Sequence, residues 1–164
     1  MPKVVTSTFK TRQAAEVALQ RLENLGIKDS QVSVIVSENT RDTAFNLKRE
    51  NKSDKGIAWG GVAGGLAGAV LASILTAGAV AVPAAGIVIS GWLVSGAAGA
   101  GAGALAGGAL GGLIGTAIPE FEAELYEGAV RDGSILLAVR AEDSEQADRI
   151  KAMLESTDAH DIAA

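Results

Sequence analysis

The amino-acid sequence predicts an α+β fold in which an apolar helical hairpin divides one charged domain into two halves. Residues 56–119 contain no Asp, Glu, Lys, Arg or His, and they hold 18 of the 21 glycines of the 164-residue chain. The flanking regions, 1–40 and 120–164, carry charge and show the alternating patterns of strands and the three-to-four spacing of helices. The total length suits a single compact domain with a large insert.

The first half of the domain, residues 1–40, has the order strand, helix, strand. Residues 3–9 (KVVTSTF) alternate β-branched side chains, which favours a strand. Thr11 is a good N-cap and Gly26 a good C-terminal cap. Residues 31–37 (QVSVIVS) alternate again and predict a second strand. Between the caps, one helical stripe collects the apolar residues Ala14, Ala15, Ala18, Leu19, Leu22 and Leu25.

Residues 41–55, which follow the first half, are polar and are expected to form a linker or a short surface helix around Thr43 to Leu47. Beyond the insert, Pro119 fits the first turn of an amphipathic helix. Residues 134–141 (SILLAVRA) predict a strand, and Ser144 is expected to cap a second helix. The residues on or near the buried side of that helix are Ala147, Ile150, Ala152, Met153 and Leu154. A short final strand is expected in 158–164. The charged parts thus read β-α-β, insert, β-α-β, which is the order of a ferredoxin-like domain with two split βαβ units.

The insert, residues 56–119, repeats glycine every four residues. This spacing places bare backbone along one face of a helix and lets a second helix approach closely. We expect helix packing and oligomerisation to use this glycine zipper. Its members are Gly60, Gly64 and Gly68, a parallel series at Gly61 and Gly65, and later Gly99, Gly103, Gly107, Gly111 and Gly115.

The segment from Pro83 to Gly86 is the strongest helix breaker in the insert, and it predicts the turn of the hairpin. The two expected arms are residues 57–82 and 86–118, and both exceed the roughly 20 residues that a bilayer span requires. Trp59 and Trp92 suit membrane-interface anchors, although packing in a protein core fits them equally well. If the halves of the domain reassemble, both ends of the insert lie on one side of any membrane.

Basic residues before the first arm favour a cytoplasmic domain under the positive-inside rule. We therefore expect a lipid bilayer and further copies of the chain as partners, in a bacterial inner (cell) membrane. The N-terminus lacks the pattern of a signal peptide. The alternative is a cytoplasmic soluble oligomer with the zipper helices buried between subunits, because a monomer in water would expose a very large apolar surface.

Two stretches of sequence carry a family resemblance. They are the turn into the second strand, GIKDSQVSVIVS, and the return from the insert, IPEFEAELYEGAVRDGSILLAV. Together with the zipper GGVAGGLAGAV, they resemble bacterial heat-induced general stress proteins and low-temperature-induced proteins that have a glycine-zipper insert. The resemblance covers nearly the whole chain. It implies an architecture and a link to stress, and it brings no catalytic residues.

The charged residues supply little for catalysis or cofactors. The net charge of −5 without a basic cluster argues against nucleic-acid binding. Absence of cysteine excludes disulfides and thiolate metal sites. The single histidine, His160, lies between Asp158 and Asp161, but a metal needs several convergent ligands. Glu120, Glu122, Glu124 and Glu127 suit an exposed helix face, and the glycines form no phosphate-binding motif. We expect no cofactor, metal or small-molecule substrate.

Three functions remain open from the sequence. The first is a non-enzymatic, stress-associated membrane protein that assembles through its zipper helices and has a structural or membrane-supporting role. The second is an oligomeric channel or pore, although the insert has no charge that would relay ions. The third is a soluble self-assembling particle or ligand-sensing oligomer.

Overall fold

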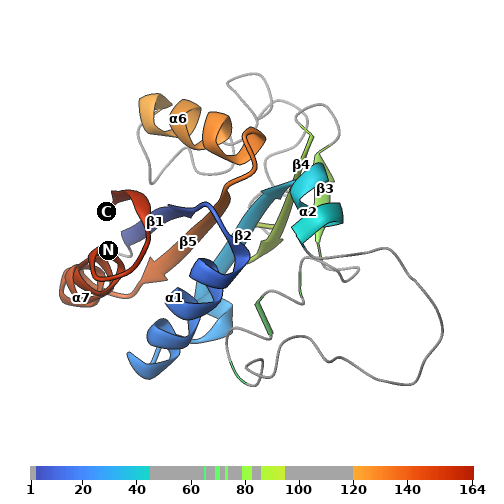
Figure 1. The fold of residues 1–164 in the computed structure, drawn as a ribbon. Coiled ribbons are helices and arrows are strands. Elements are labelled where there is room, and N and C mark those ends of the chain that lie inside the picture. The colour runs from blue at the N-terminus through green and yellow to red at the C-terminus, as the bar shows by residue number, and fades with distance from the viewer. Residues whose placement is uncertain are drawn as a thin grey trace, which may run out of the picture.

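The computed structural model describes residues 3–44, 79–82, 86–94 and 120–164, together with the single residues 65, 69, 70 and 73. These residues form an α+β fold around a six-stranded antiparallel sheet, with strand order β3-β4-β2-β5-β1-β6 (Figure 1). The helices lie on the two faces of this sheet and at one of its ends. No helix in the described ranges is long and apolar enough to cross a membrane.

The first half of the domain has the predicted elements. Strand β1 spans Lys3–Phe9, helix α1 spans Arg12–Asn24, and strand β2 spans Val32–Ser37. The Thr11 side chain accepts a hydrogen bond from the backbone N–H of Ala14, which confirms the cap. Gly26 has a φ of +83°, the left-handed conformation that favours glycine after a helix.

Small departures occur at the edges of these elements. Leu25, expected on the buried stripe, is 41% exposed because it already caps the helix. A 3₁₀ turn, η1, takes up Asp29–Gln31, so the second strand begins one residue later than predicted. Helix α2 spans Glu38–Ala44 rather than starting near Thr43. The reason is local, since the Ser37 hydroxyl accepts a hydrogen bond from the Thr40 N–H and starts the helix directly after β2.

The second half runs from helix α6 (Glu120–Arg131) through strand β5 (Ile135–Ala141) and helix α7 (Ser144–Glu155) to strand β6 (His160–Ala163). These elements confirm the predicted order. The predicted cap of the last helix was wrong. Asp143, not Ser144, accepts the hydrogen bond of the first turn, from the Gln146 N–H at 2.7 Å.

The burial pattern of α7 also differs in one position from the prediction. Ala147, Ile150 and Leu154 are buried, and Met153 is partly buried. Ala152 is exposed, because at about 100° per residue it points almost opposite to the mean direction of the buried residues Ala147, Ile150 and Leu154. The buried face is therefore narrower than the sequence pattern suggests.

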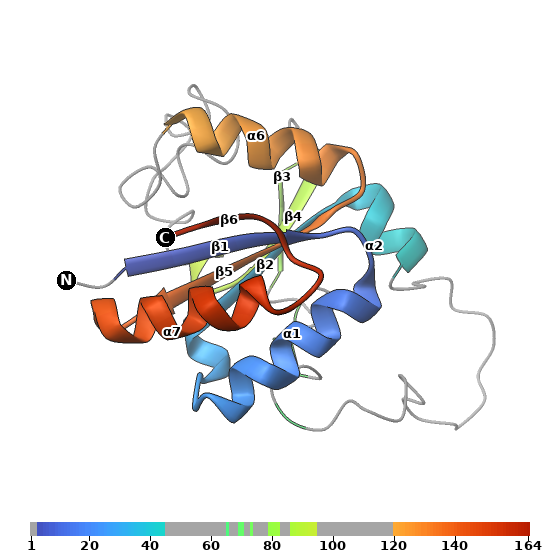
Figure 2. The same ribbon diagram turned by 60° about the vertical axis from the view of Figure 1, so that its left-hand side comes forward.

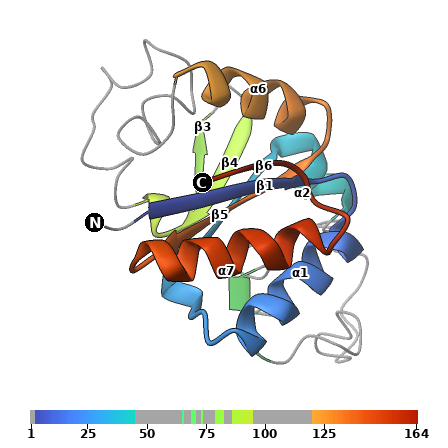
Figure 3. The ribbon, with the colours of Figure 1, turned by 90° about the vertical axis from the view of Figure 1, so that its left-hand side faces the viewer.

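The two halves interlock in the sheet. Strand β5 pairs antiparallel with both β1 and β2, so β1 and β2 run parallel to each other with a strand of the other half between them. Helices α1 and α7 cover one face of the sheet, and α6 covers the other (Figures 2 and 3). Neither half has a complete sheet by itself, so the halves fold as one unit.

Two apolar cores result, one on each face. The core between the sheet and helices α1 and α7, here the α1/α7 core, includes Phe9, Leu19, Leu22, Leu137 and Ile150. The core beneath helix α6, here the α6 core, includes Ile35, Ile87, Ile89, Tyr126 and Leu136. Strand residues alternate between the two cores, as the pleat requires.

The centre of the apolar insert is a β-hairpin, so the prediction of helix is wrong for residues 80–82 and 87–91, whereas residues 69, 70 and 73 of the first arm are helical. Strand β3 spans Val80–Val82, and strand β4 spans Ile87–Gly91. They pair antiparallel with each other, and β4 also pairs with β2 (Figure 1). β-branched side chains favour strands, and β2 offers an edge whose backbone groups need partners. The rest of the expected arms within 56–119 lies outside the described residues, apart from the few positions considered below.

Candidate functional site

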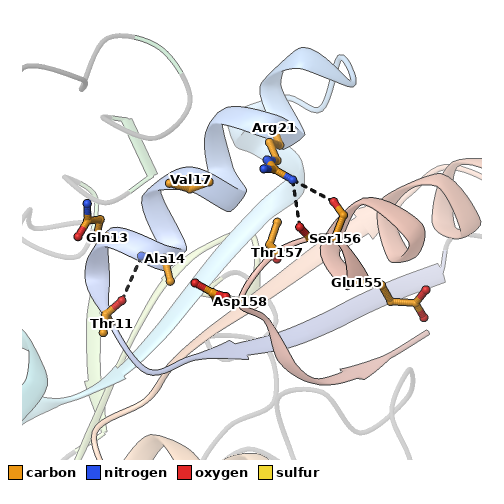
Figure 4. Close-up of a pocket in the computed structure, with 9 residues that line it drawn as sticks. All are labelled: Thr11, Gln13, Ala14, Val17, Arg21, Glu155, Ser156, Thr157 and Asp158. Atoms are coloured by element: carbon orange, nitrogen blue, oxygen red, sulfur yellow. Dashed lines mark hydrogen bonds between the residues drawn. The ribbon is translucent and has the colours of Figure 1, made fainter.

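A groove of about 540 Å³ lies between α1 and the end of α7. Figure 4 shows that its residues come from α1 and its N-cap on one side, and from the end of α7 and the α7–β6 connection on the other. The lining residues are Thr11, Gln13, Ala14, Val17, Arg21, Glu155, Ser156, Thr157 and Asp158.

Most hydrogen-bonding groups of this groove serve the fold. The Arg21 guanidinium donates from Nη1 to the Ser156 carbonyl at 3.2 Å and to its hydroxyl at 2.9 Å, which joins the two halves (Figure 4). The Thr157 hydroxyl donates to the Leu154 carbonyl at 2.6 Å. The Thr11 hydroxyl caps α1. These contacts make the groove a seam between the two halves, in which Thr11, Arg21, Ser156 and Thr157 hold the fold together.

The charges that remain in the groove do not form a catalytic arrangement. Glu155 and Asp158 carry negative charge opposite the single cation Arg21. The histidine, His160, lies on β6 and does not line the groove. General acid–base or nucleophilic chemistry needs a base within hydrogen-bonding distance of the group that it activates. The nine lining residues contain no such pair.

A second polar arrangement crosses the α6 core, and the sequence did not reveal it. The Thr6 hydroxyl donates to the Tyr126 hydroxyl at 2.9 Å, and Tyr126 donates to the Asp161 carbonyl at 2.9 Å. The Thr8 hydroxyl donates to the Asp161 carboxylate at 3.0 Å. Asp161 has a φ of +50°, which is uncommon for a residue with a side chain. These hydrogen bonds tie helix α6 directly to both β1 and the edge strand β6, and they tie β1 to β6.

His160 and Glu127 have ordinary positions, and the side chains of Glu120, Glu122 and Glu124 lie outside the described residues. His160 is exposed on β6, beside the irregular pairing of β6 with β1. Asp161 binds Thr8, and Asp158 lines the groove, so the three residues do not converge. Glu127 pairs with Arg131 at 2.6 Å along α6. No group of three metal-binding side chains occurs in the described ranges.

Parts of the first glycine-rich arm lie on the domain itself. Val70 is only 4% exposed and belongs to the α1/α7 core. The Ser73 hydroxyl donates to the Ser90 hydroxyl on β4 at 2.9 Å. Gly65 has a φ of +82°, so it is not a helical member of the predicted Gly61 and Gly65 series. An added Cβ there would meet only the flexible end of the Glu23 side chain, so the positive φ, and not close packing, favours glycine at this position.

The other predicted zipper residues, Gly60, Gly64, Gly68, Gly99, Gly103, Gly107, Gly111 and Gly115, lie outside the described residues. So do Trp59 and Pro83. Gly86 follows Pro83 in the connection of β3 to β4 and has a φ of +64°. The predicted turn region therefore connects two strands here, and not two helices.

Trp92 directly follows β4 and packs against the α6 core. The Arg140 guanidinium lies 5.4 Å from the centre of its ring, within the range of a cation–π contact. The buried indole Nε1 of Trp92 makes no hydrogen bond with any described residue. These contacts favour the packing interpretation of Trp92 over the membrane-interface interpretation.

A smaller hollow of about 370 Å³ lies at the end of β4. Its wall includes Val32, Val70 and Trp92, and it has mainly apolar character. The neighbouring Gly91 has a φ of +89°, and a Cβ there would lie 2.3 Å from the Val32 carbonyl oxygen. This close approach fixes how β4 ends against β2.

Comparison of the chain with protein-family models, with curated proteins and with solved structures found no match.

Proposed function

We propose that the protein is a non-enzymatic, self-assembling, membrane-associated protein in which a ferredoxin-like domain carries a glycine-rich apolar insert. The observation that carries this proposal is the interlocked sheet. Because β5 lies between β1 and β2, the two halves of the chain form one domain, and both ends of the insert are attached to that domain. An apolar stretch that is held in this way provides an attachment surface for a membrane or for sister chains.

The ferredoxin-like assignment rests on the strand order. Without the β3–β4 hairpin, the order of the remaining four strands is β2-β5-β1-β6. The two βαβ units are β1-α1-β2 and β5-α7-β6, and each contributes one central strand and one edge strand to these four. Their helices, α1 and α7, both pack on the same face of the sheet. This order and the shared helix face are the pattern of two split βαβ units.

The assembly part of the proposal rests on composition. Glycine inside an exposed helix costs roughly 1 kcal/mol relative to alanine. So many glycines at four-residue spacing are therefore compatible with helices only where close packing or an apolar solvent compensates for the loss. Non-enzymatic function remains our proposal, since the groove residues mainly hold the fold together.

A soluble self-assembling particle is the second candidate, and the buried position of Val70 favours it. That residue lies within the first glycine-rich arm, yet it packs into the α1/α7 core of the domain. An arm that packs partly on its own domain has less surface left for lipid. In this second function, sister chains cover the remaining glycine-rich surface.

Fractionation of cells separates the two candidates. Membranes are washed with alkaline carbonate, and the protein is sized with and without detergent. Membrane association predicts that the protein stays in the washed pellet and forms an oligomer in detergent. Release by carbonate as a defined particle would contradict membrane association and support the soluble assembly.

The contribution of the zipper is tested with Gly107→Leu, which should reduce the oligomer size while leaving the α/β domain folded. Ala109→Leu is the matched control. Two residues further along a helix correspond to about 200°, so this leucine would lie away from the glycine groove. Equal oligomer sizes for both variants and the wild type would rule out the glycine face as the contact.

A further inference from the structure

We infer that the sheet-docked state of the β3–β4 hairpin and a membrane-spanning state of the insert exclude each other, so that the hairpin acts as a conformational latch. This inference rests on the proposed membrane association. It concerns how the chain passes between a state held on the domain and a state inserted in lipid.

The latch is built into the domain on both faces. Ile87, Ile89 and Leu93 are fully or almost fully buried in the α6 core, and Val88 is buried in the α1/α7 core. Backbone pairing with β2 extends over five residues. The Leu93 N–H also donates to the Ser33 hydroxyl at 3.0 Å. The docked hairpin is therefore an integral part of the sheet.

The lengths of the stretches on either side of the docked hairpin are too short for a pair of membrane spans. With the hairpin docked, the insert consists of two separate stretches, each with both ends on the folded domain. Residues 95–119 are only 25 residues. A segment that leaves a domain and returns to the same side needs two spans of roughly 20 residues each. This stretch is long enough for one span, which would place its ends on opposite sides of the bilayer.

The first stretch is shorter still in its uncharged part. Charge ends at Lys55, and Gly65, Val70 and Ser73 already contact the domain. The interval between Lys55 and Gly65 falls below the length of a single span. Neither stretch therefore crosses and returns while the hairpin remains docked.

Release of the hairpin removes this limit. Residues 56–119 then form one uncharged run of sixty-four residues, which accommodates two spans and a turn. The hairpin sequence itself, residues 79–94, contains no charged residue, so it suits a sheet interior and a bilayer equally. The same segment is thus compatible with either environment, but not with both at once.

A reversible disulfide tests the latch, because the natural chain has no cysteine. Ile35 and Ile89 are opposite each other on β2 and β4. The Glu38 N–H donates to the Gly86 carbonyl, which makes the Ile35–Ile89 pair one of the non-hydrogen-bonded pairs, whose side chains are closest. The full-length variant Ile35→Cys/Ile89→Cys, when oxidised, locks the hairpin on β2, and its reduced form is the matched control.

Both forms are incubated with vesicles of equal parts phosphatidylcholine and phosphatidylglycerol and washed with alkaline carbonate. We expect the reduced variant and the wild type to remain in the vesicle pellet. The oxidised variant should fall to the level of a sample without vesicles, and reductant should restore its retention. Retention of the oxidised form would overturn the latch while leaving membrane association intact. Loss of the reduced variant and the wild type alike would overturn membrane association, and the latch with it.

Discussion

The four strands from the charged regions and the two strands from the apolar insert share one sheet, but different features of the sequence specify them. Strands β1, β2, β5 and β6 belong to βαβ units whose helices begin at recognisable caps. Strands β3 and β4 lie in a stretch where glycine spacing and uncharged composition indicate helices. Composition alone therefore does not separate a membrane helix from a buried strand.

Among the substitutions considered, Gly91→Val is expected to have the largest effect on the stability of the β3–β4 hairpin relative to the strands from the charged regions. The new Cβ would lie 2.3 Å from the Val32 carbonyl oxygen, and the φ of +89° is strained for valine. We expect a loss of about 2–4 kcal/mol in the free energy of the docked hairpin. Hydrogen exchange of residues 87–90 would increase, while exchange in β1 and β5 would change much less.

Gly128→Ala is the control for this substitution. Gly128 lies within α6, where an added Cβ meets nothing within 4 Å. Alanine there should stabilise the protein by about 0.5–1 kcal/mol, as measured by urea unfolding. If Gly91→Val left exchange of the β4 amides unchanged, the described pairing of β4 with β2 would be wrong.

A smaller effect is expected from Tyr126→Phe, which tests how α6 is tied to the edge strand. The substitution removes a hydroxyl that accepts from Thr6 and donates to the Asp161 carbonyl. Loss of both bonds in a buried site should cost about 1–2 kcal/mol, and it should speed hydrogen exchange in β6. Leu125→Gln, at a neighbouring side chain that is 56% exposed, should change stability by less than about 0.5 kcal/mol. Equal effects of the two substitutions would contradict the role of the hydroxyl.

The smallest effect compares two candidate caps of α7. Asp143→Ala should cost about 1 kcal/mol, because its carboxylate accepts from the Gln146 N–H. Ser144→Ala should be close to neutral, since Ser144 is already the first residue of the helix. Thr11→Ala, which removes the cap of α1, gives the reference value by urea unfolding. A greater loss for Ser144→Ala than for Asp143→Ala would favour the cap that the sequence suggested.

Much of the domain was predictable because its signals are local. The alternation in residues 3–9, the cap at Thr11 and the glycine at position 26 all act within a few residues of one another. The candidate groove was not predictable. Arg21 and Ser156 are 135 residues apart, and no pattern in either segment indicates that they meet. The same applies to Thr6 and Tyr126, which are 120 residues apart.

The sequence by itself determined the order of the βαβ elements, most of their caps, and a central stretch that has no charge. Only the tertiary structure decided that residues 80–82 and 87–91 pair as strands. A helix satisfies its backbone hydrogen bonds within the segment, so its pattern is visible locally. A strand takes its partners from elsewhere, and β4 finds them on β2, about fifty residues earlier in the chain. Whether the uncharged stretch contributes a helix or a strand thus depends on the sheet edge that β2 provides.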